Sequence, residues 1–200
     1  MKTNSQKIKT LTATAILIAL VIVFQMISLI PIGPIAFTIA LTVIVVGAVL
    51  YGPKVGAILG AVFGAVVVVQ TVTGMGGLLS LMMFQFNPII TVALCMVKGI
   101  AAGLVPGLIY SAFRHTKFKN IGIILAAISA PIVNTSIFFA GALTVFSGVL
   151  EEFIADVGID SIETLIISGI IIPNFIPEFL INVALIPVVL RVISIVSPKK

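Results

Sequence analysis

The chain has 200 residues, of which 60% are hydrophobic and only 8% charged, and its net charge is +5. This composition excludes a soluble globular domain, in which about a quarter of the residues are charged. The positive charge does not indicate nucleic-acid binding, because the basic residues lie at the ends of apolar segments. A single cysteine, Cys95, excludes an intrachain disulfide and a cysteine-based metal cluster. We therefore expect an all-α integral membrane protein that lies in a lipid bilayer.

Apolar runs that approach or exceed the length of a membrane-spanning helix alternate with short turns along the whole chain. They predict one domain, residues 1–200, with six spans at approximately 11–30, 35–50, 55–72, 88–113, 121–150 and 164–196. Lys and Arg occur at the N-terminus, between spans 2 and 3, between spans 4 and 5, and at the C-terminus, whereas the other connections contain none. By the positive-inside rule, both termini are expected on the cytoplasmic side.

Small residues recur at four-residue spacing on the first and third spans. Ala15 and Ala19 lie near the cytoplasmic end of the first span, where they favour close contact with another helix. Packing within the bundle and docking to a partner both fit this pair. Gly56, Gly60 and Gly64 form one stripe on the third span and predict a helix that approaches backbone to backbone. Residues 73–87, rich in Gly and Met and without charge, are expected to form a loop at the interface or over a cavity mouth.

The fourth span carries Lys98, the most informative residue of the chain, near its middle. A cation at this depth costs about 3 kcal/mol on insertion scales, so a carboxylate, a polar cavity or an anionic ligand should compensate for it. Asn87 and Thr91 recur at intervals of three to four residues on the same helical face as Lys98.

The fifth and sixth spans add polar groups at comparable depth. Asn134 lies within the fifth span, and Asn174 and Glu178 share a face of the sixth, beside Pro173 and Pro177. Lipid cannot satisfy such groups, and helices broken by proline are tolerated at membrane depth where they line cavities. A purely structural Lys98–Glu178 ion pair would explain the two charges but not the amides. We therefore predict a substrate-binding site that is open to the acidic, outward side, formed by Asn87, Thr91, Lys98, Asn134, Asn174 and Glu178.

Motifs that would indicate several other functional classes are absent from the sequence. The segment 47–54 has glycine spacing like that of a phosphate-binding loop, but Pro53 interrupts it and no Ser or Thr follows. Neither a zinc-protease motif nor a serine nucleophile elbow occurs, and the single histidine, His115, lies in a basic turn. We expect no catalytic residues, no metal site and no cofactor, and hence not an enzyme. The two halves show no inverted repeat, which argues against a self-sufficient secondary transporter.

The order of these motifs resembles that of the substrate-binding S-components of energy-coupling-factor (ECF) vitamin transporters, over essentially the whole chain. The resemblance rests on small residues in the first span, a Gly-Pro turn with a glycine stripe, a Lys-Gly motif in the fourth span, and polar motifs in the last two. These are Ala15-x-x-x-Ala19, Tyr51-Gly52-Pro53-x-x-Gly56-x-x-x-Gly60-x-x-x-Gly64, Lys98-Gly99-x-x-Ala102-Gly103-Leu104, Pro131-x-x-Asn134-Thr135 and Asn174-x-x-x-Glu178.

The resemblance implies a subunit of the bacterial plasma membrane that binds a vitamin from outside. It also implies docking, through Ala15 and Ala19, onto a membrane-embedded coupling subunit that carries two ATPases, with no role for nucleic acid. Lys98 favours an anionic ligand, and the scarcity of tyrosine and tryptophan argues against ligands that need stacking surfaces. Pantothenate is therefore the expected vitamin. Pyridoxine, hydroxymethylpyrimidine and folate remain alternatives, as do an autonomous small-solute channel or carrier and a scaffold whose charges merely pair.

Overall fold

The computed structural model describes residues 4–27 and 39–196. Within these ranges the chain is almost entirely helical and contains no strand, as expected for an all-α membrane protein. The elements are α1 (Asn4–Ile27), α2 (Ala40–Tyr51), α3 (Pro53–Val72), α4 (Leu78–Phe86), α5 (Pro88–Phe113), α6 (Lys119–Val145), α7 (Ser147–Val157), α8 (Ile162–Thr164), the π-helix η1 (Leu165–Phe175), α9 (Ile176–Ala184) and α10 (Ile186–Val196).

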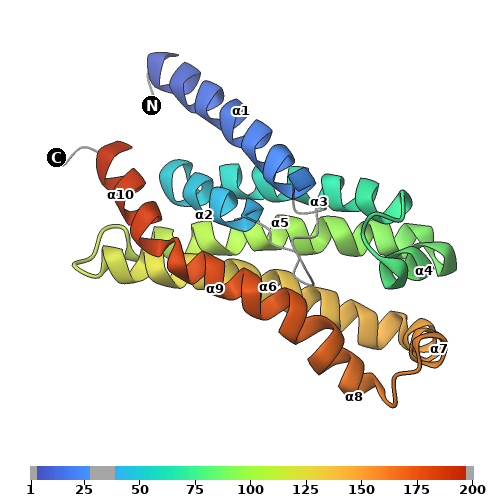
Figure 1. Cartoon of the computed structure of the whole chain (residues 1–200). Helices are drawn as coiled ribbons and strands as arrows, with labels where there is room; N and C mark the ends of the chain where they lie inside the picture. The colour runs from blue at the N-terminus through green and yellow to red at the C-terminus, as the bar shows by residue number, and fades with distance from the viewer. Residues whose placement is uncertain (1–3, 28–38, 197–200) are drawn as a thin grey trace.

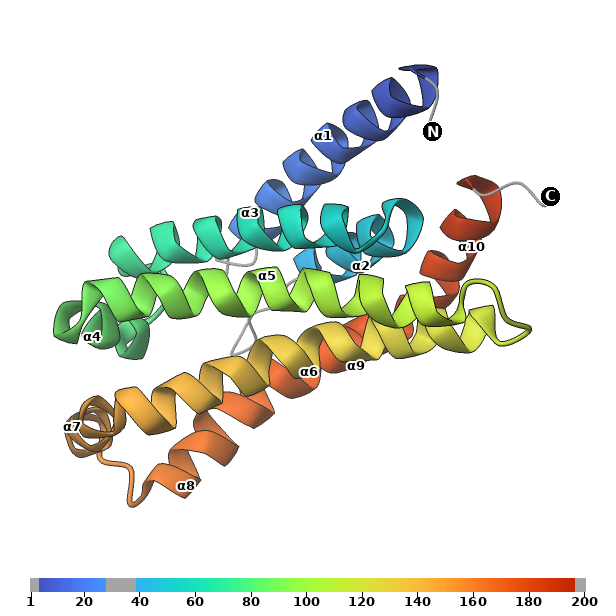
Figure 2. The ribbon, with the colours of Figure 1, turned by 180° about the vertical axis from the view of Figure 1, so that it is seen from behind.

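Helix α5 lies at the centre of the molecule, between α3 and α6 (Figures 1 and 2). The segment η1–α9 packs along α6, and α2 packs against α3 and α5. Helix α1 contacts α2 and α3 with one end and diverges from the bundle towards its N-terminus (Figure 1). Helices α3, α5 and α6 therefore form one continuous layer, with α5 in the middle.

Five helical segments of the described chain are long and apolar enough to cross a membrane: residues 7–27, 53–72, 88–113, 119–145 and 176–195. The predicted second span appears as α2, an apolar helix of only 12 residues that begins at Ala40. The residues before it, 28–38, lie outside the described part, so the count of six spans stays a prediction. The predicted fifth span ends at Val145, where buried Phe146 separates α6 from α7.

The glycine stripe of α3 faces α5. A β-carbon at Gly56 or Gly60 would overlap the carbonyl oxygen of Gly103 or Gly99, and one at Gly64 would lie 2.8 Å from that of Cys95. The two backbones are therefore in direct contact along three turns, which only residues without side chains permit. This seam fixes the depth and rotation of α5.

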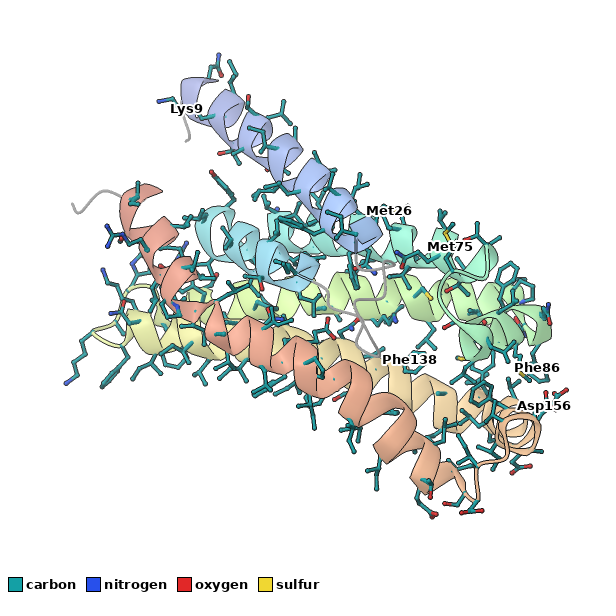
Figure 3. The ribbon with its side chains drawn as sticks, in the orientation of Figure 1. Lys9, Met26, Met75, Phe86, Phe138 and Asp156 are labelled. Atoms are coloured by element: carbon teal, nitrogen blue, oxygen red, sulfur yellow. The ribbon has the colours of Figure 1, made fainter. Side chains whose placement is uncertain are left out.

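Basic and acidic residues lie at opposite ends of the molecule. Helix α1 begins and α10 ends at one end, and Figure 3 shows Lys9 there and Asp156 of α7 at the other. The turn between α5 and α6, which holds the Arg114–Lys119 cluster, belongs to the basic end (Figure 1). This distribution places both described chain ends on the same side, as the positive-inside rule requires.

The expectation of a loop over residues 73–87 is wrong for its second half, because Leu78–Phe86 form α4. Met83 of α4 is buried in an apolar cluster with Phe146, Val149 and Leu150, from the end of α6 and from α7. Helices α4 and α7 therefore form a packed cap over the acidic end of the bundle.

Candidate functional site

Lys98 lies in the interior of α5, about 16 Å along the helix from Asn87. Its ammonium nitrogen lies 4.9 Å from the centroid of the Phe138 ring on α6. Cation–π contacts at this distance are worth about 0.5–2 kcal/mol, less than the cost of holding a cation at mid-membrane depth. Phe138, labelled in Figure 3, belongs to the part of α6 nearer to α7. An aromatic face thus holds the cation without neutralising it.

Glu178 enters the same region from α9, which packs on α6. It is 7% exposed, and its Oε1 atom has no hydrogen-bond donor among the described residues. The carboxyl attracts the Lys98 ammonium electrostatically, but the two side chains do not form a hydrogen-bonded ion pair in the described part of the chain. The structural ion pair considered above is therefore not the arrangement seen here.

Asn134 precedes Phe138 by one turn of α6, so the two share a helical face. It is 9% exposed, and its Oδ1 atom is the second buried acceptor without a donor in the described chain. Lys98, Asn134 and Glu178 thus come from three helices, α5, α6 and α9, of which α6 packs against the other two and carries Phe138 against the Lys98 ammonium. The combination of one cation and two free acceptors can bind an anionic molecule that also donates hydrogen bonds.

Of the other predicted site residues, Asn87 and Thr91 lie nearer the start of α5, and both have hydrogen-bond partners. Asn87 caps α5, and its Oδ1 atom accepts from the Ile90 amide at 3.1 Å. The buried Thr91 hydroxyl donates to the Met83 carbonyl of α4 at 2.8 Å. Thr91 also lines a crevice of about 120 Å³ together with residues of α3, α4 and α5. Asn174 belongs to η1, and its side chain is outside the described part.

Sequence reasoning missed Phe138 and the buried amide pairs. The Thr42 hydroxyl of α2 donates to Asn182 Oδ1 at 3.0 Å, and Asn182 Nδ2 donates to the Glu178 carbonyl oxygen at 2.9 Å. This chain of bonds fixes the α9 turn that carries Glu178. The contact of Lys98 with Phe138 had one signal in the sequence, the four-residue spacing that puts Phe138 on the same helical face as Asn134. The partner of Asn182 had no such signal, because Thr42 is 140 residues away.

A second buried amide pair joins α1 to α3. Gln25 Nε2 donates to Gln70 Oε1, and Gln70 Nε2 donates to the Gln25 carbonyl oxygen, both at 3.0 Å. These bonds hold the end of α1 that lies against the bundle. Ala15 and Ala19, nearer the diverging end, are both exposed, so their faces are available to lipid or to another protein.

The described chain contains no group of three or more His, Cys, Asp or Glu side chains that could hold a metal ion.

Comparison with known proteins gives one result for the chain as a whole. Residues 9–190 match the sequence profile of a family described as "ECF transporter, substrate-specific component". No curated protein matches the chain.

Proposed function

The chain belongs to the family of ECF transporter substrate-specific components, and from this premise we propose that it binds pantothenate for import across the bacterial plasma membrane. Proteins of this family are substrate-binding transport subunits of the membrane, and they work with an ECF module. In this proposal the module consists of a coupling subunit and two ATPases, which supply the energy that this chain does not.

The observation that carries the proposal is what surrounds the Lys98 ammonium. Its ammonium lies against the ring of Phe138, at mid-membrane depth and without a bonded carboxylate in the described chain. An anionic ligand that reaches this ammonium would offset its desolvation. Pantothenate fits because it is a small monoanion with one amide and two hydroxyl groups. Asn87, Thr91 and Asn174 extend the proposed site along α5 and η1 towards the acidic end.

Calorimetry on the purified full chain tests this proposal. Wild type and Lys98→Met are titrated with pantothenate, pyridoxine, hydroxymethylpyrimidine and folate. We expect wild type to bind pantothenate and Lys98→Met to bind it at least about tenfold more weakly, because a charge-assisted bond is worth about 1.5–3 kcal/mol. Lys54→Met, which removes an exposed lysine at the start of α3, is the matched control and should bind like wild type. A wild-type chain that binds none of the four vitamins would contradict the proposal.

Docking to the coupling subunit is assigned to Ala15 and Ala19. Both are exposed on α1, the helix that diverges from the bundle (Figure 1), and small side chains allow another helix to approach closely. Ala19→Trp in the assembled transporter should abolish vitamin uptake and leave calorimetric binding unchanged. Leu20→Trp, on a different exposed face of α1, is the control and should transport normally. Loss of binding in Ala19→Trp would instead assign the pair to packing within the bundle.

Two other functions make different predictions. An autonomous channel or carrier would produce vitamin flux in liposomes that contain only this chain, whereas a substrate-specific component requires the ATPases. A scaffold would show strong stability coupling between Lys98→Met and Glu178→Gln in a double-mutant cycle and no effect of either on ligand binding.

A further inference from the structure

Two buried acceptors in the bundle have no donor within the described chain. They are Oδ1 of Asn134 and Oε1 of Glu178, and both side chains are more than nine-tenths buried. Buried polar groups are almost always hydrogen-bonded, and an unsatisfied one is costly to keep. Other buried amides of this chain follow that rule, since Asn182 and Gln70 both bond to named partners. The exceptions therefore call for a specific explanation.

Asn134 and Glu178 are on α6 and α9, and α6 packs against both α9 and α5, the helix that carries the Lys98 ammonium. Asn134 is one helical turn from Phe138, whose ring contacts the Lys98 ammonium. Glu178 is on α9, which packs against α6, and attracts the same ammonium electrostatically. One region therefore offers a positive group from α5 and acceptor oxygens from α6 and α9.

This polarity restricts what can occupy the region. A metal cation would be repelled by the Lys98 ammonium, and a simple anion would leave both acceptors unsatisfied. A neutral donor-rich molecule would satisfy the acceptors but not the cation. A molecule with an anionic group at one end and N–H or O–H donors at the other would satisfy all three side chains.

We propose that the substrate is two-ended: its anionic group contacts Lys98, and at least two of its N–H or O–H donors bond to Asn134 Oδ1 and Glu178 Oε1. This inference rests on the proposed transport function and specifies the chemistry of the same site. Pantothenate satisfies it through its carboxylate, hydroxyls and amide. Neutral pyridoxine and hydroxymethylpyrimidine do not, because they have no anionic group.

The test uses three small probes on the purified full chain. Pantothenate has both ends, pantothenol keeps the donors but replaces the carboxylate with an alcohol, and heptanoate keeps a carboxylate but has no donors beyond it. Calorimetry should give the tightest binding for pantothenate, with each one-ended probe weaker by about tenfold or more. Equal affinity for pantothenate and either one-ended probe would overturn the inference.

Variants then test the assigned residues. Asn134→Leu and Glu178→Met should weaken pantothenate binding by about 10- to 100-fold. The unliganded variants should melt at or above the wild-type temperature, because each loses a buried group that no donor satisfies. A purely structural role for these residues predicts the opposite, a lower melting temperature with binding retained.

Gln70→Leu is the matched control, because it removes a buried amide that does have a partner, Gln25. It should lower the melting temperature and leave the affinity within about twofold of wild type. If Asn134→Leu and Glu178→Met also stay within twofold, the donor-binding assignment is wrong while the proposed transport function stands. If the vitamin that binds has no anion, or has no donors, the two-ended substrate is wrong and the transport function again stands. If no vitamin binds the wild-type chain, both fail.

Discussion

The seam between α3 and α5 makes the most quantitative prediction about the fold, through Gly60→Ala. A β-carbon at Gly60 would overlap the Gly99 carbonyl oxygen and lie 2.9 Å from the Gly99 carbonyl carbon and 3.2 Å from Ile100 Cα. All three atoms belong to the backbone of α5, so no side-chain rotation can relieve the overlap. Moving the helices apart by about 1 Å would lose a quarter to a half of the dispersion energy of each affected contact. Overpacking of this kind costs about 1–3 kcal/mol.

Gly148→Ala on α7 isolates that cost, because a β-carbon there meets nothing within 4 Å. Both variants gain helix propensity, about 1 kcal/mol for Gly to Ala in a helix interior and less at Gly148, the second residue of α7, so the comparison understates the cost of the overlap. Gly47→Ala should be intermediate, since its closest contact is the flexible end of the Leu59 side chain. The expected order of stability is therefore Gly148→Ala, then Gly47→Ala, then Gly60→Ala, with about 1–3 kcal/mol between the first and the last.

Reversible unfolding in mixed micelles of detergent and sodium dodecyl sulfate, followed by circular dichroism, measures these differences. The ligand-free chain is used, so that binding does not contribute to stability. If Gly60→Ala proves as stable as Gly148→Ala, the two backbones are not in contact at this level and the packing of α5 described here is wrong.

Two further predictions concern hydrogen bonds at helix ends. Gln70→Leu should destabilise the chain by about 1–3 kcal/mol because it removes both hydrogen bonds that Gln70 makes with Gln25. The double variant Gln25→Leu/Gln70→Leu should cost less than the sum of the two single variants, because the bonds are shared, and a cost equal to or above that sum in the same unfolding assay would contradict this. Asn87→Ala should cost about 0.5–2 kcal/mol through loss of the α5 cap, whereas Asn87→Ser should stay within a few tenths of wild type. Equal destabilisation by Ala and Ser would show that the bond to Ile90 is not what Asn87 contributes.

Much of the fold was predictable because it depends on patterns within single helices. Composition indicated a helical membrane protein, and the spacing of Gly56, Gly60 and Gly64 predicted a helix with a close neighbour, although not that the neighbour is α5. The break at Phe146 was not predicted, because only Ser147 and Gly148 interrupt the apolar run before it resumes at Val149 and Leu150. Burial of Phe146 and its contacts with α4 are tertiary effects.

The last predicted span shows a second limit of sequence reasoning. Pro173 and Pro177 indicated an irregular helix, but not that residues Leu165–Phe175 would adopt π-helical hydrogen bonding. A π-helix changes the angular spacing between Asn174 and Glu178, so the shared face expected from four-residue spacing no longer follows from the sequence.

Sequence reasoning named the polar residues of the candidate site but not their arrangement, and their role in substrate binding stays a prediction. Buried polar residues stand out in an apolar chain, and Lys98, Asn134 and Glu178 were found for that reason. Their relative positions depend on the rotation of α5, α6 and α9, which no local pattern encodes. The contact of Lys98 with Phe138 rather than with Glu178 follows from that rotation.

The central claim is that the charges in the middle of the bundle are kept for a ligand. Native mass spectrometry of the chain purified from bacterial membranes, with extraction and identification of any small molecule retained, tests it most directly. The account predicts an anionic, hydrogen-bond-donating vitamin at about one per wild-type chain, and little or none on Lys98→Met. A wild-type chain that retains nothing, or a Lys98→Met chain that retains the same molecule to the same extent, would contradict it.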